Sequence, residues 1–177
     1  MANYKTEITA IMEKGGLCSR KEYDLLRKEL KSKAPCNLLV FGLGHESEWL
    51  AKLNEGGRTI FVENSMKWIE ANKGKGLEIV YHDYQTKLLN DGKLYPLDKF
   101  LIKTLPFQGV EFDVVFVDAP IGRTQGRMAS IVTGFAMCKE GGVMLVHDIN
   151  RATEKMYTDA VTSGVYDVVD RMAIVRK

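Results

Sequence analysis

Acidic side chains and imidazoles follow several short apolar runs of this chain, where they could bind a ligand or carry protons. Glu63 and Asp83 each follow one run, Asp118 follows another, and His147 and Asp148 follow a fourth. If these runs are parallel strands of one sheet, their carboxyl ends meet at one edge. The sequence therefore predicts a polar site along that edge.

A glycine turn followed by a distant acid predicts a nucleoside site. Gly42-Leu43-Gly44 follows an apolar run, and Glu63 lies 19 positions after Gly44. Glycines at a strand-to-helix turn let the backbone approach a ligand, and an acid about 20 residues further on can bind the ribose hydroxyls. A turn without a ligand is the other interpretation, because the motif alone is weak. The expected cofactor-binding residues are Gly42, Gly44, His45, Glu63, Asp83 and Tyr84.

The turn favours S-adenosylmethionine over a dinucleotide. The dinucleotide fingerprint G-x-G-x-x-G requires a third glycine, and Ser47 stands at that position. Glu46, at the start of the next helix, would repel a pyrophosphate that a helix N-terminus attracts. S-adenosylmethionine has a ribose but no phosphate, and its positive sulfonium suits acidic surroundings. We therefore expect a methyl donor and not NAD.

Methyl transfer to oxygen requires help with the proton of the accepting hydroxyl, which a base removes or a metal ion polarises. His147 is the expected base because the ordinary imidazole pKa lies near neutrality. Asp118 and Asp148 would orient His147 or hold a divalent cation through their oxygens. Three structural alternatives stay open: Asp118 caps the following helix, His147 is a hydrogen-bonded core residue, or Asp148 pairs with Arg151.

Three arginines are the expected acceptor-binding residues. Arg123, Arg127 and Arg151 follow the strands on loops, and a guanidinium binds a carboxylate in bidentate fashion. Arg127 and Arg151 could instead form fixed ion pairs with the nearby aspartates. Trp49 and Trp68 lie at helical spacing with other apolar residues, and we assign both to the core.

The elements that would position these residues alternate between strand and helix. Apolar runs without polar alternation are typical of strands buried on both faces of a parallel sheet. An S-x-x-E capping box at Ser19 and Glu22 begins a helix before the first strand. The chain is thus expected to be one α/β domain with a doubly wound, mostly parallel sheet, consisting of a helical segment at 1–34 and a core at 35–177. The expected strands are 37–41, 58–62, 77–81, 112–117 and 142–146, with closing strands at 166–169 and 172–175.

Charge, cysteine content and the absence of targeting signals narrow the functional classes to which this chain could belong. The 177 residues carry a net charge of only +2, with basic residues scattered among acids, which gives no support to nucleic-acid binding. Cys18, Cys36 and Cys138 are odd in number and lack C-x-x-C spacing, which argues against a disulfide framework or a structural zinc site and indicates packing residues. The sequence shows neither a signal peptide nor a membrane span, so we expect a cytoplasmic protein.

Four stretches resemble the plant glucuronoxylan 4-O-methyltransferases and their relatives in polysaccharide biosynthesis. They are PCNLLVFGLGHESEWLAKLNEGGRTIFVEN at 35–64, Tyr84-x-Thr86-Lys87, VDAPIGRTQGRMASI at 117–131 and VHDINR at 146–151. The resemblance covers the chain from about residue 35 to residue 151.

This resemblance implies methyl transfer from S-adenosylmethionine to a sugar hydroxyl, typically on a uronic acid such as the 4-hydroxyl of glucuronate in a polysaccharide. It implies donor-site roles for Gly42, Gly44 and Glu63, and acceptor-site or catalytic roles for Asp118, Arg127, His147, Asp148 and Arg151. It also implies dependence on a divalent cation, which agrees with Asp118 and Asp148 as candidate metal ligands.

The chain differs from the plant proteins in ways that leave the acceptor open. Those proteins are longer and carry an N-terminal Golgi anchor and an insertion before the fourth strand. The related catechol-type enzymes bind a metal with an Asp-Asn pair after the fifth strand, whereas Ile149 follows Asp148 here. Two rival functions remain, a noncatalytic component of polysaccharide synthesis and a methyltransferase for small molecules.

Overall fold

The structure is a computed structural model that describes residues 4–84, 91–121 and 126–177. The strands are β1 (Asn37–Phe41), β2 (Arg58–Glu63), β3 (Glu78–Tyr81), β4 (Phe112–Val117), β5 (Cys138–His147), β6 (Asp167–Val169) and β7 (Met172–Arg176). The helices are α1 (Tyr4–Glu13), α2 (Arg20–Lys33), α3 (Ser47–Leu53), α4 (Met66–Asn72), the 3₁₀ helix η2 (Leu97–Phe100), α5 (Met128–Met137) and α6 (Ala152–Thr162).

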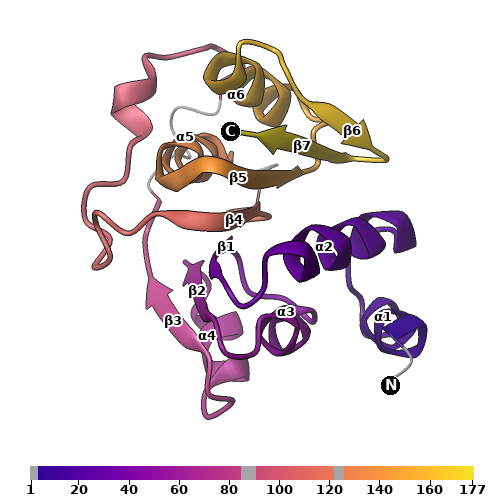
Figure 1. Ribbon diagram of the computed structural model, residues 1–177. Helices are drawn as coiled ribbons and strands as arrows, with labels where there is room; N and C mark the ends of the chain where they lie inside the picture. Colours follow the sequence, from indigo (N-terminus) through magenta and orange to yellow (C-terminus); the bar gives the residue numbers. More distant parts are fainter. Residues whose placement is uncertain (1–3, 85–90, 122–125) are drawn as a thin grey trace.

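The strands form one sheet in the order β3-β2-β1-β4-β5-β7-β6 (Figure 1). Strands β1 to β5 pair in parallel, and β7 runs antiparallel to both β5 and β6. This is the doubly wound, mostly parallel sheet that the sequence predicts. From β1 the strands are added toward one edge of the sheet as far as β3, and from β4 they are added toward the other edge. Ligands of such sheets bind at the carboxyl ends of the strands beside the point between β1 and β4 where this order reverses.

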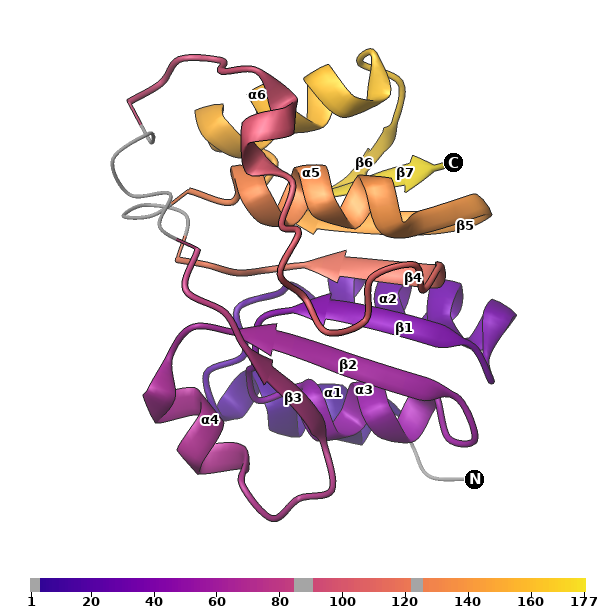
Figure 2. The same cartoon turned by 90° about the vertical axis from the view of Figure 1, so that its left-hand side faces the viewer.

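Side chains alternate between two layers of core. In β1, Leu38 and Val40 pack with α1, α2 and α3, while Leu39 and Phe41 pack with η2, α5 and α6. Figures 1 and 2 show these two groups of helices on opposite faces of the sheet. Burial on both faces explains why the central strands read as continuous apolar runs.

The helix before the first strand begins where the capping box predicts. The backbone N–H of Glu22 donates to Ser19 Oγ, and the Ser19 N–H donates to Glu22 Oε2. Tyr23, Leu26 and Leu30 then face the sheet in the core. Because Glu22 is itself buried, the cap also brings a carboxylate into the interior, which bears on the site described below.

The prediction that strand 77–81 is buried on both faces is wrong. β3 lies at the edge of the sheet, and Glu78 and Tyr81 at its ends are exposed. An edge strand has one neighbour and incomplete cover, so its apolar residues do not indicate burial. Trp49 is buried as expected, whereas Trp68 is only half-buried beside His45.

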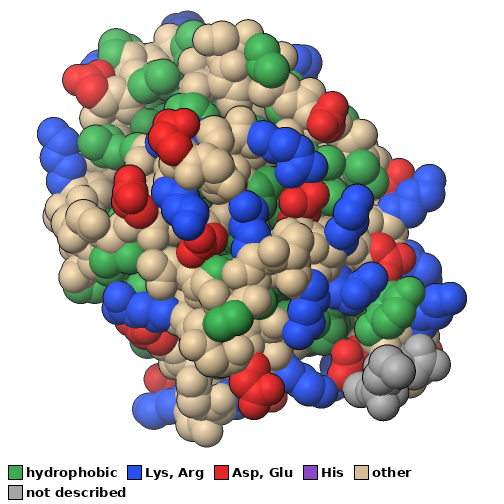
Figure 3. Space-filling view, viewed as in Figure 1, with side chains coloured by type: hydrophobic (Ala, Val, Ile, Leu, Met, Phe, Trp, Pro, Cys, Tyr) green, Lys and Arg blue, Asp and Glu red, His purple; other side chains and the backbone are tan. Residues whose placement is uncertain are grey.

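On the face shown in Figure 3, Lys and Arg side chains lie among Asp and Glu side chains and do not form a separate basic area. Among the described residues, no helix combines the length and apolar character needed to cross a bilayer.

Candidate active site

The glycine turn and the acid at the end of β2 are joined by hydrogen bonds. The Leu43 N–H donates to Glu63 Oε2 over 2.7 Å. The N–H groups of Asn64 and Ser65 donate to Glu63 Oε1 over 2.7 and 2.6 Å. Oε2 thus has one of these donors and keeps a lone pair, since a carboxylate oxygen can accept two hydrogen bonds. Glu63 fixes the turn and still has capacity for a ligand hydroxyl.

The turn has the close approach that requires glycine. Gly42 has φ 118°, and a Cβ added there would lie 3.1 Å from the Cβ of Ala119. A Cβ on Gly44 would collide with the carboxylate of Glu46, which folds back over the turn. Gly42 therefore brings the turn after β1 against the backbone that follows β4.

The other expected cofactor-binding residues occupy different surroundings. His45 is exposed, and its ring makes an edge contact with Trp68 at 5.1 Å between centroids. Asp83 is also exposed. Tyr84 is buried in the core, and its hydroxyl donates to the Val62 carbonyl oxygen over 3.4 Å. Burial raises the pKa of Tyr84 well above its usual range.

The three residues expected to be catalytic lie together. His147 Nδ1 is 3.0 Å from Asp118 Oδ1 and 3.5 Å from Asp148 Oδ2. Asp118 does not cap α5, because the residue before this helix is Arg127 and it makes no side-chain cap hydrogen bond. Asp148 has φ 61°, a left-handed conformation that turns the chain sharply after β5. Parallel pairing of β4 and β5 thus brings all three side chains together.

Arg127 forms buried ion pairs and does not present its guanidinium to a carboxylate in solution. Its guanidinium reaches Asp118 Oδ1 and Asp148 Oδ2, both over 2.9 Å, and donates to the carbonyl oxygens of Pro120 and His147. Only 4% of its side chain is exposed. The fixed ion-pair interpretation is therefore the one that describes Arg127 in this structure.

Asp148 is held by further guanidinium groups. Arg151 Nη1 lies 2.8 Å from Asp148 Oδ2, and Arg171 Nη1 lies 3.0 Å from Oδ1. The proposed Asp148–Arg151 pair is thus present. Arg151 keeps 30% of its side chain exposed, so it remains accessible from solution. Arg123 lies outside the described residues, and its expected role in acceptor binding stays a prediction.

His147 has no exposed surface, whereas the side chain of Asp118 is 18% exposed. Burial by itself lowers the pKa of His147. The hydrogen bond to Asp118 and the charges of Asp118, Asp148 and Glu22 outweigh it and raise that pKa above its ordinary value. Asp118 is therefore the member of the pair that solution can reach, and His147 lies behind it.

A divalent cation does not fit between Asp118 and Asp148 in this arrangement. Their ligand oxygens and His147 Nδ1 lie within 4.8 Å of one another, which is the spacing of a metal cluster. However, Arg127 bridges the same two oxygens, and Arg151 and Arg171 hold Asp148. A dication there would face three guanidinium charges at contact distance, which Coulomb repulsion opposes.

Four charged residues of the site were not assigned to it from sequence, the buried Glu22, Glu46 and Glu154 and the partly exposed Arg171. Glu22 Oε2 lies 3.4 Å from His147 Nε2, and Arg171 on the loop before β7 reaches Asp148. Glu46 is buried in the turn after β1, and burial raises its pKa to about 7. Glu154 lies 3.6 Å from Arg151, and burial raises its pKa too. The capping box identified Glu22 as a helix cap, but no sequence signal placed it beside β5.

Comparison with known sequences shows which proteins this chain is similar to. Residues 21–108 match the model of the family described as IRX15/IRX15L/GXM. Glucuronoxylan 4-O-methyltransferase 2 of Arabidopsis thaliana is 36% identical over 82% of this chain and 60% of its own length. Arabinogalactan O-methyltransferase 2 of the same plant is 32% identical over 85% of this chain and 62% of its length. The chain thus spans about three fifths of these curated relatives.

Solved methyltransferases share the fold. A TehB-like S-adenosylmethionine-dependent methyltransferase from Corynebacterium glutamicum superposes with a TM-score of 0.57 at 11% identity, over 99% of this chain and 96% of its own. The MycE methyltransferase of mycinamycin biosynthesis, in complex with Mg and SAH, gives 0.52 at 15% identity over 89% of this chain and 45% of its own. At these identities the likeness establishes the class I methyltransferase fold and nothing finer.

Proposed function

Because the chain belongs to the IRX15/IRX15L/GXM family, we propose that it transfers a methyl group from S-adenosylmethionine to a sugar hydroxyl. The relatives named above act on glucuronoxylan and arabinogalactan according to their names. The 4-hydroxyl of a glucuronic acid residue is therefore the first acceptor to test. The two rival functions predict different results in the same experiment, as described below.

One observation carries this proposal. The turn that would hold the donor touches the strand end that carries Asp118, because a Cβ on Gly42 would lie 3.5 Å from the Asp118 carbonyl carbon. A donor bound over this turn would thus lie beside the only partly exposed member of the Asp118, His147 and Asp148 group. Methyl transfer needs this proximity, since donor methyl and acceptor oxygen must meet in line.

Glu63 and Glu46 suit the two ends of the donor. Glu63 would accept a hydrogen bond from a ribose hydroxyl through the free lone pair of Oε2. Glu46 is a buried carboxyl beside the turn and would face the positively charged sulfonium of S-adenosylmethionine. Neither group requires a phosphate, which is consistent with the absence of the third glycine of the dinucleotide fingerprint.

The proton of the acceptor hydroxyl would pass to the Asp118–His147 pair. Asp118 is the group that can contact the acceptor, and His147 Nδ1 is 3.0 Å behind it. Arg127 holds Asp118 in place through a second contact to the same oxygen. General bases of this kind contribute about 10²–10⁴-fold to rate. In this proposal Asp118 is catalytic and His147 and Arg127 are positioning residues.

Arg151, whose side chain is 30% exposed, suits the carboxylate of a uronic acid. Its guanidinium already contacts Asp148 Oδ2 through Nη1, which fixes its orientation. A guanidinium can bind two anions through different N–H groups. The buried Arg127 is not available for this role, because both of its Nη atoms contact aspartates.

Incubation with S-adenosylmethionine labelled in the methyl group tests the proposal directly. The acceptors are glucuronoxylan oligosaccharides, the same oligosaccharides with the uronic acid reduced to glucose, arabinogalactan, and a set of phenols. We expect label only on acceptors with a free glucuronate 4-hydroxyl. Label on phenols alone would support the small-molecule enzyme, and donor binding without transfer to any acceptor would support the noncatalytic component.

A further inference from the structure

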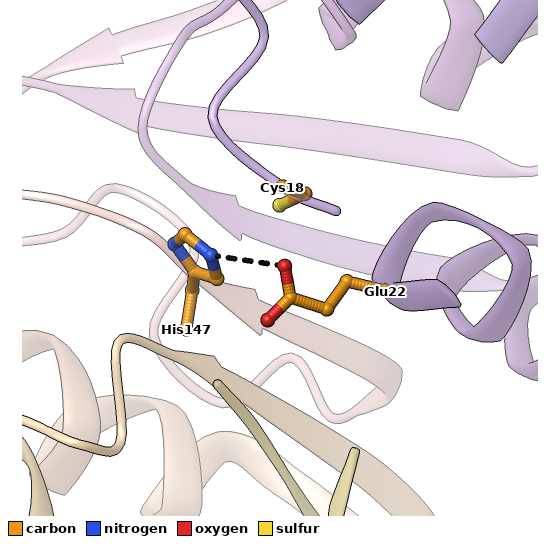
Figure 4. Close-up of side chains that lie close together, drawn as sticks. All are labelled: Cys18, Glu22 and His147. Atoms are coloured by element: carbon orange, nitrogen blue, oxygen red, sulfur yellow. Dashed lines mark ion pairs between the residues drawn. The ribbon is translucent and has the colours of Figure 1, made fainter. Parts of the chain in front are cut away.

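On the other side of His147 from Asp118, a second group of side chains meets. Cys18 precedes α2, Glu22 lies in its first turn, and His147 ends β5 (Figure 4). All three are buried, with 4% of Cys18 and none of the other two exposed. The group therefore joins the N-terminal helical segment to the centre of the sheet.

The Nε2 atom of His147 has no hydrogen-bond partner although it is buried. It points at the Glu22 carboxylate, as Figure 4 shows, with 3.4 Å between Nε2 and Oε2. If His147 donates its Nδ1 proton to Asp118, the Nε2 lone pair faces the lone pairs of a carboxylate. Only a proton or a metal cation between the two atoms makes this contact favourable.

The spacing suits a zinc-type ion. Two N or O ligands about 2.0–2.1 Å from zinc at the tetrahedral angle lie about 3.4 Å apart. The distance between His147 Nε2 and Glu22 Oε2 has this value, 3.4 Å. Cys18 Sγ and these two atoms all lie within 4.8 Å of one another. Thiolate, imidazole and carboxylate form a donor set that zinc uses.

Hydrogen bonds with neighbouring groups orient His147 and Glu22, as is usual for the ligands of metal sites. The Asp118 carboxylate would accept the other ring N–H of His147, the usual carboxylate–histidine–metal arrangement. Glu22 accepts backbone hydrogen bonds from Ser19 through Oε2 and from Arg171 through Oε1. These bonds would hold His147 and Glu22 before an ion arrives.

Negative charge surrounds the group. Burial, followed by the charges of Asp118, Glu46 and Glu22, raises the pKa of the Cys18 thiol. Arg171 acts in the opposite direction, with Nη2 3.8 Å from Glu22 Oε2. A dication would relieve the repulsion among the three carboxylates. The neighbouring Leu17 is 71% exposed, so the segment that carries Cys18 borders solvent.

We propose that Cys18, Glu22 and His147 bind a divalent transition-metal ion such as Zn²⁺. On binding, the Cys18 thiol and the Nε2–H of the His147 imidazolium release their protons to solvent, and the thiolate, Glu22 Oε2 and the now neutral His147 Nε2 bond to the ion. The ion fastens the N-terminal segment to β5 and leaves Nδ1 of His147 on Asp118. This site is separate from the Asp118–Asp148 pair, which Arg127 bridges.

The test uses the whole chain. Protein stripped with chelator is equilibrated with Zn²⁺, desalted and analysed for metal by mass spectrometry. We expect about one ion per chain in the wild type. Cys18→Ser should weaken Zn²⁺ binding by at least about 10–100-fold, the loss that even removal of a supporting partner causes. Cys138→Ser removes a buried cysteine elsewhere in the core and is the matched control, with unchanged binding.

Cobalt provides a readout that does not depend on a variant folding. Co²⁺ added to the stripped wild type should produce a thiolate-to-cobalt charge-transfer band. Absence of the charge-transfer band would overturn the proposal, because Cys18 would then not be a ligand. Undiminished Zn²⁺ binding in folded Cys18→Ser would overturn it as well. In that case no metal ion is bound at this place, and His147 is instead protonated on both ring nitrogens, so that the imidazolium itself is the cation between Asp118 and Glu22.

Discussion

The backbone N–H of Leu43 donates to Glu63 Oε2 over 2.7 Å, although the two residues are 20 positions apart. This bond links the turn after β1 to the end of β2, which are neighbouring parallel strands. Glu63 also accepts from Asn64 and Ser65 through its other oxygen. One side chain therefore shapes the turn and, in the proposed function, would also accept a hydrogen bond from the ribose, so the two roles must be separated by experiment.

We predict that Glu63→Gln weakens binding of S-adenosylmethionine and destabilises the turn. A glutamine has one acceptor oxygen where the carboxylate has two, so at least one charge-assisted hydrogen bond is lost, at about 1.5–3 kcal/mol. Isothermal titration calorimetry measures the donor affinity. Glu78→Gln, which changes an exposed acid on β3, is the control and should bind as the wild type does. Equal affinity in the two variants would remove Glu63 from the donor site.

Arg127→Lys should lower the free energy of unfolding by about 3–5 kcal/mol, the cost of breaking a buried ion pair. A lysine ammonium cannot reproduce the planar guanidinium that contacts Asp118 and Asp148 at once. Urea denaturation measures the change. The control is Arg58→Lys, which alters an exposed pair with Glu78 and should change nothing measurable. A small effect at Arg127 would mean that the buried network is not held by this residue.

His147→Gln is expected to lower turnover by about 10²–10⁴-fold while donor affinity stays near that of the wild type. The glutamine keeps a polar group near Asp118 but cannot share a proton with it in the way an imidazole does. Asp118→Asn should lower turnover at least as much, because Asp118 is the partly exposed member of the pair. Steady-state kinetics, with the acceptor that the labelling experiment identifies, separates turnover from affinity.

The double variant Asp118→Ala, His147→Ala decides whether this pair is the site. Turnover close to that of the wild type, in a folded protein, would exclude both residues from catalysis. Arg151 and the region of Tyr84 would then be the remaining candidates. Circular dichroism of the double variant establishes that it is folded before kinetics is interpreted.

The raised pKa of Glu46 leads to a prediction of how the free energy of unfolding depends on pH. Burial is the main cause that raises its pKa from 4.5 to about 7, which corresponds to about 3 kcal/mol. Between these values the folded chain keeps a proton that the unfolded chain releases. Stability due to Glu46 therefore falls as pH rises from about 4.5 to about 7 and is constant beyond that range.

We expect Glu46→Gln to remove most of this fall, since a glutamine does not titrate. Urea unfolding at pH 5 and pH 8, with chelator present, measures it in both proteins. The raised pKa of His147 changes stability in the same direction, so the wild type is compared with the variant and not with a calculated curve. An identical pH dependence in the two proteins would show that Glu46 ionises normally.

The sequence was sufficient for the fold class and for most of the strands, although β5 begins at Cys138, before the predicted start at 142. Apolar runs predicted β1 and β4 with the observed bounds, and the capping box predicted the start of α2. These signals are local, because strand burial and helix capping depend on residues close together in the chain. The edge position of β3 was missed because an apolar run does not say how many neighbours a strand has.

By itself, the sequence also determined that Asp118, His147 and Asp148 would lie at one edge of the sheet, since parallel strands end together. Only the tertiary structure decided what each side chain contacts. It placed Glu22 of α2 behind His147, more than 100 positions away in the sequence. It also placed Arg171 against Asp148, 23 positions away. Such contacts depend on how α2 and the loop before β7 pack on the sheet, and packing is set by the whole core rather than by any local pattern of residues.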